Sequence, residues 1–147
     1  MIDQVMALAA SGSAALMAAA MTDVWSSTRS AVARVFGRHD PDGQRVMLAR
    51  LDRDVTALEA AGTDRDRARE ELTAAWRTRL GDWIEEHPAA ADDLEELIQQ
   101  ICKQLPSQQQ AWFMSVVGRD NSIVYAVMRG NIYQMSHDPR IARDTNH

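Results

Sequence analysis

Up to Leu105, large apolar residues recur at spacings of three and four, which is the period of an amphipathic α-helix. Asp40 suits the N-cap of a helix, and Gly62 suits a helix end. Pro88 suits the first turn of a last helix, which Pro106 would stop. The pattern predicts four helices, over residues 3–36, 41–61, 64–86 and 88–105. Their short connections favour an antiparallel bundle, with no strand before residue 106.

The pattern changes after Pro106. The next few residues are polar and uncharged, as in Gln108-Gln109-Gln110, and are interpreted as a linker. Beyond them the helical period gives way to runs rich in β-branched and aromatic residues, which favour strands. These runs lie at 113–117, 123–128 and 132–135. The expected organisation is a helical bundle over 1–105, a linker over 106–112 and a short β-forming tail over 113–147, in a mainly-α fold class.

The first predicted helix contains an unusual stretch, because no charged residue lies between Gln4 and Thr22. A secretory signal would carry basic residues ahead of it, whereas Asp3 precedes this one. Its many alanines, with Ser11-Gly12-Ser13 in the middle, are too weakly apolar for a constitutive transmembrane helix and allow a bend. Such a stretch is still able to enter lipid when many copies are held together. The large residues expected to enter a membrane are Val5, Leu8, Leu16, Met17 and Met21.

The composition fits one globular domain. The chain has 147 residues, of which 46% are hydrophobic and 25% are charged. The net charge is −5, and it is concentrated in residues 37–105, which carry ten basic and sixteen acidic side chains. Nucleic acid binding normally requires a basic face. No such face is visible, so nucleic acid is not an expected partner.

Candidate catalytic and metal-binding residues are sparse. The four histidines, His39, His87, His137 and His147, lie at no spacing typical of metal ligands. The single cysteine, Cys102, falls in an apolar helical pattern and is interpreted as a small buried hydrophobe. There is no Gly-rich phosphate loop and no nucleophile elbow. The sequence therefore predicts a protein that is not an enzyme, with no catalytic residue, metal site or cofactor.

The tail contains two halves that echo each other, 118–125 and 130–134. Each half places a Gly and an Asn before a β-branched residue with a Tyr nearby. Two short strands joined by a turn would form a β-arch. In a cross-β stack of such copies, the side-chain amides would form hydrogen-bonded ladders and the apolar side chains would be buried. The alternatives are a β-hairpin folded onto the bundle, or a strand exchanged in a dimer. The residues expected to carry self-assembly are Gly118, Asn121, Ile123, Val124, Tyr125, Val127, Gly130, Asn131, Ile132, Tyr133 and Gln134.

On these residues the tail resembles the bacterial amyloid signalling motifs of actinobacteria, which are related in style to the RHIM motif. Met128, Arg129 and Met135 depart from such repeats, which often carry Gly, Asn or Gln there. In that family the motif follows a small helical membrane-attacking domain, called Bell in bacteria and HeLo in fungi. A second copy of the motif lies on an NLR-type receptor. The resemblance therefore implies as partners the chain itself, as a homo-oligomer or fibril, a receptor with a matching motif, and membrane lipid.

Two functions follow as hypotheses. In the first, the chain is a cell-death or immunity effector in the cytoplasm, whose stacked tails drive the apolar N-terminal helices into the inner face of the plasma membrane. In the second, it is a non-enzymatic oligomeric adaptor or scaffold that uses the tail for docking. The placement of the N-terminal stretch distinguishes them. Burial on all sides inside the bundle favours the adaptor, and loose or exposed placement favours the effector.

Overall fold

The computed structural model describes residues 2–120, with the side chains of residues 4–117. The α-helices are α1 (Ile2–Ala19), α2 (Trp25–His39), α3 (Gln44–Ala60), α4 (Arg65–Glu86), α5 (Ala91–Gln104) and α6 (Ser107–Asp120). Short 3₁₀ turns, η1 (Gly62–Asp64) and η2 (Pro88–Ala90), precede α4 and α5. No strand occurs in this part of the chain. The mainly helical class is therefore confirmed, with more helices than the four expected.

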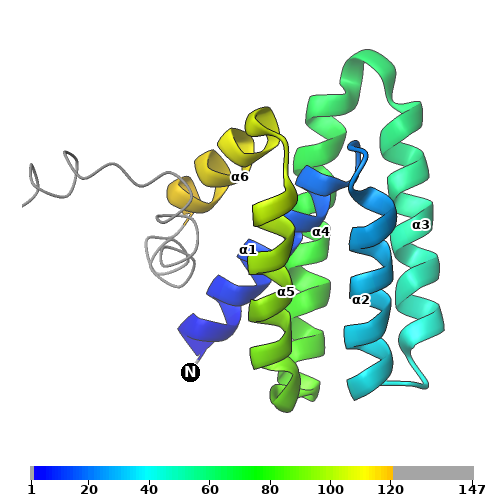
Figure 1. The fold of residues 1–147 in the computed structure, drawn as a ribbon, viewed down its shortest axis with the longest axis vertical. Helices are drawn as coiled ribbons and strands as arrows, with labels where there is room; N and C mark the ends of the chain where they lie inside the picture. Colours follow the sequence, from blue (N-terminus) through cyan, green and yellow to red (C-terminus); the bar gives the residue numbers. More distant parts are fainter. Residues whose placement is uncertain (1, 121–147) are drawn as a thin grey trace, which may run out of the picture.

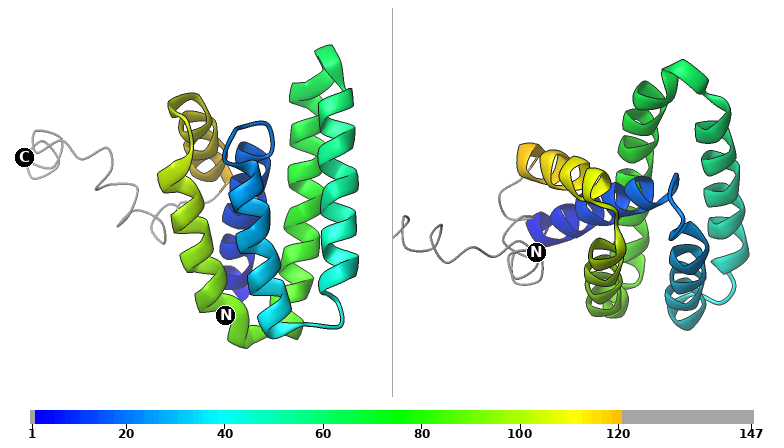
Figure 2. Two further views of the ribbon diagram at one scale, coloured as in Figure 1. Left: turned by 45° about the vertical axis from the view of Figure 1, so that its right-hand side comes forward. Right: turned by 45° about the horizontal axis from the view of Figure 1, so that its top comes forward.

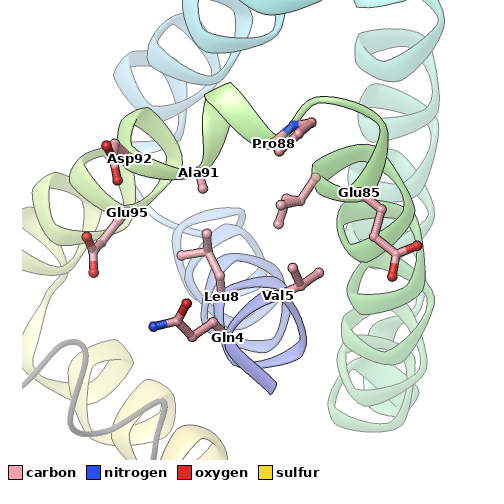
Figure 3. Close-up of a pocket in the computed structure, with 9 residues that line it drawn as sticks. Gln4, Val5, Leu8, Glu85, Pro88, Ala91, Asp92 and Glu95 are labelled. Carbon is pink, nitrogen blue, oxygen red and sulfur yellow. The ribbon is translucent and has the colours of Figure 1, made fainter. Parts of the chain in front are cut away.

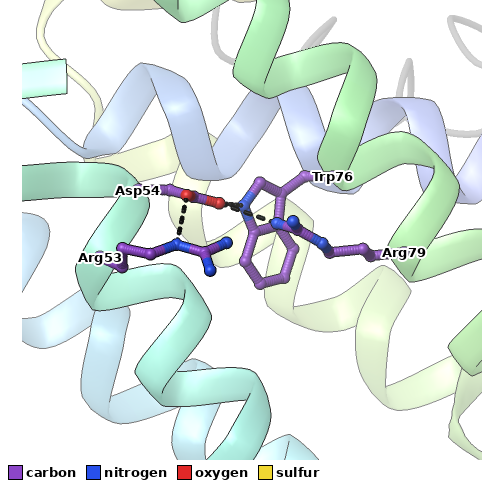
Figure 4. A network of polar contacts seen from close by, with 4 residues as sticks. All are labelled: Arg53, Asp54, Trp76 and Arg79. Carbon is purple, nitrogen blue, oxygen red and sulfur yellow. Dashed lines mark hydrogen bonds and ion pairs between the residues drawn. The ribbon is translucent and has the colours of Figure 1, made fainter. Parts of the chain in front are cut away.

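Helix α1 crosses the bundle obliquely, with α4, α5 and α6 against it and with α2 and α3 farther out (Figures 1 and 2). Helices α2 and α3 form an outer pair, in which α3 packs on α4 and α2 packs on α5. The α3–α4 hairpin turns at Gly62, whose φ of 61° is a conformation that glycine adopts without strain. Inside this hairpin, Asp54 of α3 is held by side chains of α4 (Figure 4).

Three of the four predicted helices agree with the structure. The segments predicted at 64–86 and 88–105 correspond to α4 and to η2 with α5. The segment predicted at 41–61 corresponds to α3, which begins later because a turn comes first. In that turn the carboxylate of Asp40 accepts a hydrogen bond from the amide of Gly43 at 3.0 Å. The predicted N-cap role of Asp40 is therefore wrong: Gly43 precedes α3 directly, and Asp40 stabilises the turn before it.

The predicted continuous helix over 3–36 is wrong, because the chain turns between α1 and α2. The hydroxyl of Thr22 donates a hydrogen bond to the carbonyl of Ala19 at 2.8 Å and accepts one from the amide of Val24 at 3.3 Å. A threonine side chain thus completes the backbone hydrogen bonding of the turn, where sequence offers no Gly or Pro. Gly37, which directly follows the predicted helix, lies inside α2.

The bend that Ser11-Gly12-Ser13 would allow does not end the helix, since α1 continues through these residues. Small residues here bring helices close together instead. A Cβ at Gly12 would lie 3.0 Å from Cδ1 of Leu80 and 3.5 Å from Cδ1 of Ile98. A Cβ at Gly81 of α4 would lie 3.7 Å from Cβ of Ala9. Glycines on both helices therefore set the close crossing of α1 and α4.

The linker predicted over 106–112 and the strand predicted over 113–117 are both wrong, because this region forms α6. The buried residues Phe113, Val116 and Val117 follow helical spacing and join the core. Packing of this face against α1 outweighs the β-propensity of the valines, because propensity is weak beside tertiary burial.

Candidate functional site

The predicted membrane-attacking helix is the most enclosed part of the molecule. Every residue of the chain from Ala7 to Ala20 is buried. Of the five residues expected to enter a membrane, Leu8, Leu16 and Met17 are buried in the core, while Val5 and Met21 are partly buried against it. From Leu8 onward the large apolar side chains of α1 are thus occupied by contacts within the bundle, whereas Met6 is 49% exposed.

The two serines in the middle of α1 are satisfied by their own helix. The hydroxyl of Ser11 donates to the carbonyl of Ala7 at 3.1 Å, and that of Ser13 donates to the carbonyl of Ala10 at 3.0 Å. Both serines are fully enclosed. Buried hydroxyls normally require such a partner. Neither hydroxyl therefore needs a hydrogen-bond partner from the helices around α1.

No helix within residues 2–120 is long and apolar enough to cross a membrane. The absence of charge from Gln4 to Thr22 matches instead the position of α1 inside the bundle. A charged side chain buried there without a partner would be strongly destabilising. The core position thus accounts for the pattern that first suggested membrane insertion.

Helix α6 covers one side of α1 and leads towards the predicted self-assembling tail. Arg69 of α4 donates a hydrogen bond to Gln109 at 2.8 Å, and its guanidinium lies 4.0 Å from the ring centre of Trp112. The side-chain Nε2 of Gln110 donates to the carbonyls of Cys102 and Leu105 at 3.0 and 3.2 Å. Gln110 therefore caps the C-terminal end of α5, whose last carbonyls lack helical partners.

Of the residues expected to carry self-assembly, Gly118 lies in α6, which is helical and not extended. The other ten lie outside the residues that the structure describes: Asn121, Ile123, Val124, Tyr125, Val127, Gly130, Asn131, Ile132, Tyr133 and Gln134. Their self-assembly stays a prediction.

A groove of about 470 Å³ lies where the N-terminal end of α1 meets the end of α4 and the start of α5 (Figure 3). Its apolar lining consists of Val5, Leu8, Ile84, Pro88 and Ala91, and its polar lining of Gln4, Glu85, Asp92 and Glu95. The carboxylates stand on two sides of the opening (Figure 3). No local sequence pattern marks this groove, because its lining comes from helices far apart in sequence.

A cluster of ionisable side chains joins α2 to α5. Nε2 of His39 lies 2.6 Å from Oδ2 of Asp93, and Arg38 donates to the same oxygen at 2.9 Å. The hydrogen bonds from His39 and Arg38 hold the pKa of Asp93 below its ordinary value. Within the described part of the chain, no group of three or more His, Cys, Asp or Glu residues has a geometry able to hold a metal ion.

The single cysteine is enclosed in the core. Cys102 is 1% exposed, and burial raises the pKa of its thiol to about 12. A thiol in this state is neither a nucleophile nor a metal ligand at neutral pH. The interpretation of Cys102 as a buried hydrophobe therefore agrees with its environment.

No family model matches this chain, and no curated protein or solved structure matches it either.

Proposed function

We propose that this chain is a non-enzymatic adaptor: a helical bundle that carries a self-associating C-terminal segment and gathers copies of itself, or receptors with a matching segment. The observation that carries the choice is the burial of α1 from Ala7 to Ala20. An apolar helix whose every face is already covered gains little by moving into lipid, because lipid is no more apolar than the core it would leave.

The proposal separates two roles of the chain. The described bundle provides a stable body with a large apolar core. The segment beyond Asp120 holds ten of the eleven residues predicted to self-assemble, so it provides the association. Linking the two would raise the local concentration of bundles once segments stack, without any new contact between the bundles.

Membrane attack is the second candidate, and one observation favours it. Ser11 and Ser13 are hydrogen-bonded within α1, so their transfer into lipid would expose no unsatisfied hydroxyl. In that case stacking of the C-terminal segments would have to withdraw α1 from its neighbours.

A disulfide lock distinguishes the two functions. Ala9→Cys combined with Gly81→Cys places two Cβ atoms about 3.7 Å apart, within the usual range for a disulfide. The oxidised protein cannot separate α1 from α4, and the reduced protein is its matched control. Cys102 is left in place, because it is buried and its pKa is about 12.

Both forms are assayed for dye release from anionic liposomes and for self-association by light scattering and thioflavin-T fluorescence. The adaptor function predicts equal self-association of the two forms with no dye release. Dye release by the reduced form alone would establish membrane attack instead. Ile123→Pro with Ile132→Pro should abolish association, because proline lacks the backbone N–H that hydrogen-bonds to the neighbouring strand. Association that survives both prolines would contradict a role for this segment.

A further inference from the structure

The groove between α1, α4 and α5 has the features of a peptide-binding surface. Its floor offers the side chains of Val5, Leu8 and Ile84, and acidic groups flank it. Within the described residues, none of the carboxylates of Glu85, Asp92 and Glu95 forms an ion pair. An apolar floor with free carboxylates at its edge fits an apolar peptide that carries an arginine, because guanidinium and carboxylate match in charge and geometry.

The path of α6 brings one such segment to the groove. Helix α6 starts beside the C-terminal end of α1, where Met21 and Thr22 share a cavity with Ser107 and Gln108. It then packs along α1. Its last turn lies on the side of the molecule where α1 begins (Figures 1 and 2). The chain beyond Asp120 therefore leaves the bundle on the side where α1 starts, farther up in the view of Figure 1 than the turn between α4 and α5.

The segment beyond α6 matches the groove in charge and length. Residues 121–147 contain three arginines, and Arg129 stands directly after the apolar residues Val127 and Met128. The nine peptide steps from Asp120 to Arg129 span up to about 30 Å when extended. That reach exceeds the length of α1, which is about 27 Å for a helix of this size.

From the groove, its free carboxylates and the path of α6, we propose that residues 121–147 dock into the groove of their own chain, with Arg129 paired to the carboxylates and its apolar neighbours on the floor. The docked segment is withheld from other copies. The groove therefore regulates the self-association suggested under the proposed function, and only this last step rests on that function.

Docking is tested in the full chain at a dilution where it is monomeric. A nitroxide label on Asn131→Cys reports proximity, because the buried Cys102 does not react. The expected result is paramagnetic broadening of the backbone amides of Leu8 and Ala91. Glu85→Lys with Glu95→Lys should abolish the broadening, and so should Arg129→Glu. Combining the three changes should restore it, because the charges are then exchanged.

The matched control is Glu59→Lys with Glu71→Lys, which makes the same change in net charge on exposed sites outside the groove and should leave the broadening intact. No broadening in the parent chain, or broadening that the reversals leave unchanged, would overturn the proposal. Broadening found only when labelled and isotopically enriched chains are mixed would also overturn it, in favour of docking between copies. The lag of thioflavin-T assembly should shorten several-fold in the reversed variants. A chain that docks but never assembles would leave docking standing and refute the proposed function alone.

Discussion

The indole nitrogen of Trp76 donates a hydrogen bond to Oδ2 of Asp54 at 2.8 Å, inside the α3–α4 hairpin (Figure 4). Arg79 donates to the same oxygen at 2.8 Å, and Arg53 donates to Oδ1 at 3.2 Å. Trp76 is fully buried, so its N–H has no access to solvent. One buried carboxylate thus satisfies the polar group of a fully buried tryptophan and joins two helices.

Loss of this carboxylate should destabilise the bundle. Asp54→Ala leaves the Trp76 N–H buried and unpaired, which costs about 1–3 kcal/mol of unfolding free energy. Asp52→Ala is the matched control two residues away, because Asp52 pairs with Arg29 on the surface. Such exposed pairs are worth about 0–1 kcal/mol. Urea denaturation of both variants measures the difference, and equal losses would contradict a special role for Asp54.

Acid should weaken the hairpin through the same residue. Burial would raise the pKa of Asp54, but hydrogen bonds from Arg79, Trp76 and Arg53 outweigh it and hold the pKa below its ordinary value. The folded state therefore binds this proton less readily than the unfolded state, and stability should fall as pH drops below about 4. Asp54→Asn should flatten this part of the dependence of melting temperature on pH. Parallel curves for variant and parent would show that other carboxylates carry it.

The two glycines at the crossing of α1 and α4 should respond differently to substitution. Gly12→Val adds atoms where a Cβ already lies 3.0 Å from Leu80, and such overpacking costs about 1–3 kcal/mol. Gly81→Ala meets only an ordinary contact with Ala9 at 3.7 Å. It should be neutral or stabilising by up to about 1 kcal/mol, because alanine favours helices. Thermal unfolding compares the two, and similar losses would contradict this crossing geometry.

Substitutions in α6 distinguish a helix from a strand. In a strand, positions 113, 115 and 117 would share one face. In α6 the buried positions are Phe113, Val116 and Val117, while Ser115 is exposed. Phe113→Ala should therefore cost about 3–5 kcal/mol, and Val116→Ala should also destabilise. Ser115→Ala should have little effect. Tolerance at 116 with sensitivity at 115, measured by denaturation, would restore the strand prediction.

The sequence predicted the helices correctly where residues typical of helix ends and the spacing of apolar residues agreed. Gly62 follows the end of α3, as expected of a residue that ends a helix. Trp76 and Trp83 lie seven residues apart in α4, which is a helical spacing, and both are in the core. It was misleading where tertiary contacts decided the structure. The turn at Thr22 depends on hydrogen bonds between its side-chain hydroxyl and the backbone of Ala19 and Val24. No Gly or Pro marks this turn in the sequence.

The spacing of apolar residues in α6 indicates a helix, although a strand was predicted over 113–117. Phe113, Val116 and Val117 are spaced by three and one, which suits one face of a helix. The β-branched side chains of Val116 and Val117 and the aromatic ring of Phe113 favoured the strand prediction instead. The groove had no comparable signal, because Val5, Glu85 and Asp92 come together only through the packing of three helices.

The central position of α1 also has a consequence for how the chain is made. Synthesis proceeds from the N-terminal end, and the helices that cover α1 lie at 65–86, 91–104 and 107–120. Until those helices have been translated, the apolar residues of α1 have no core to enter. The bundle thus depends on contacts between residues distant in sequence, which delays folding and prolongs exposure of an aggregation-prone helix. A nascent chain of this protein should therefore be a client of chaperones that recognise apolar segments at the ribosome.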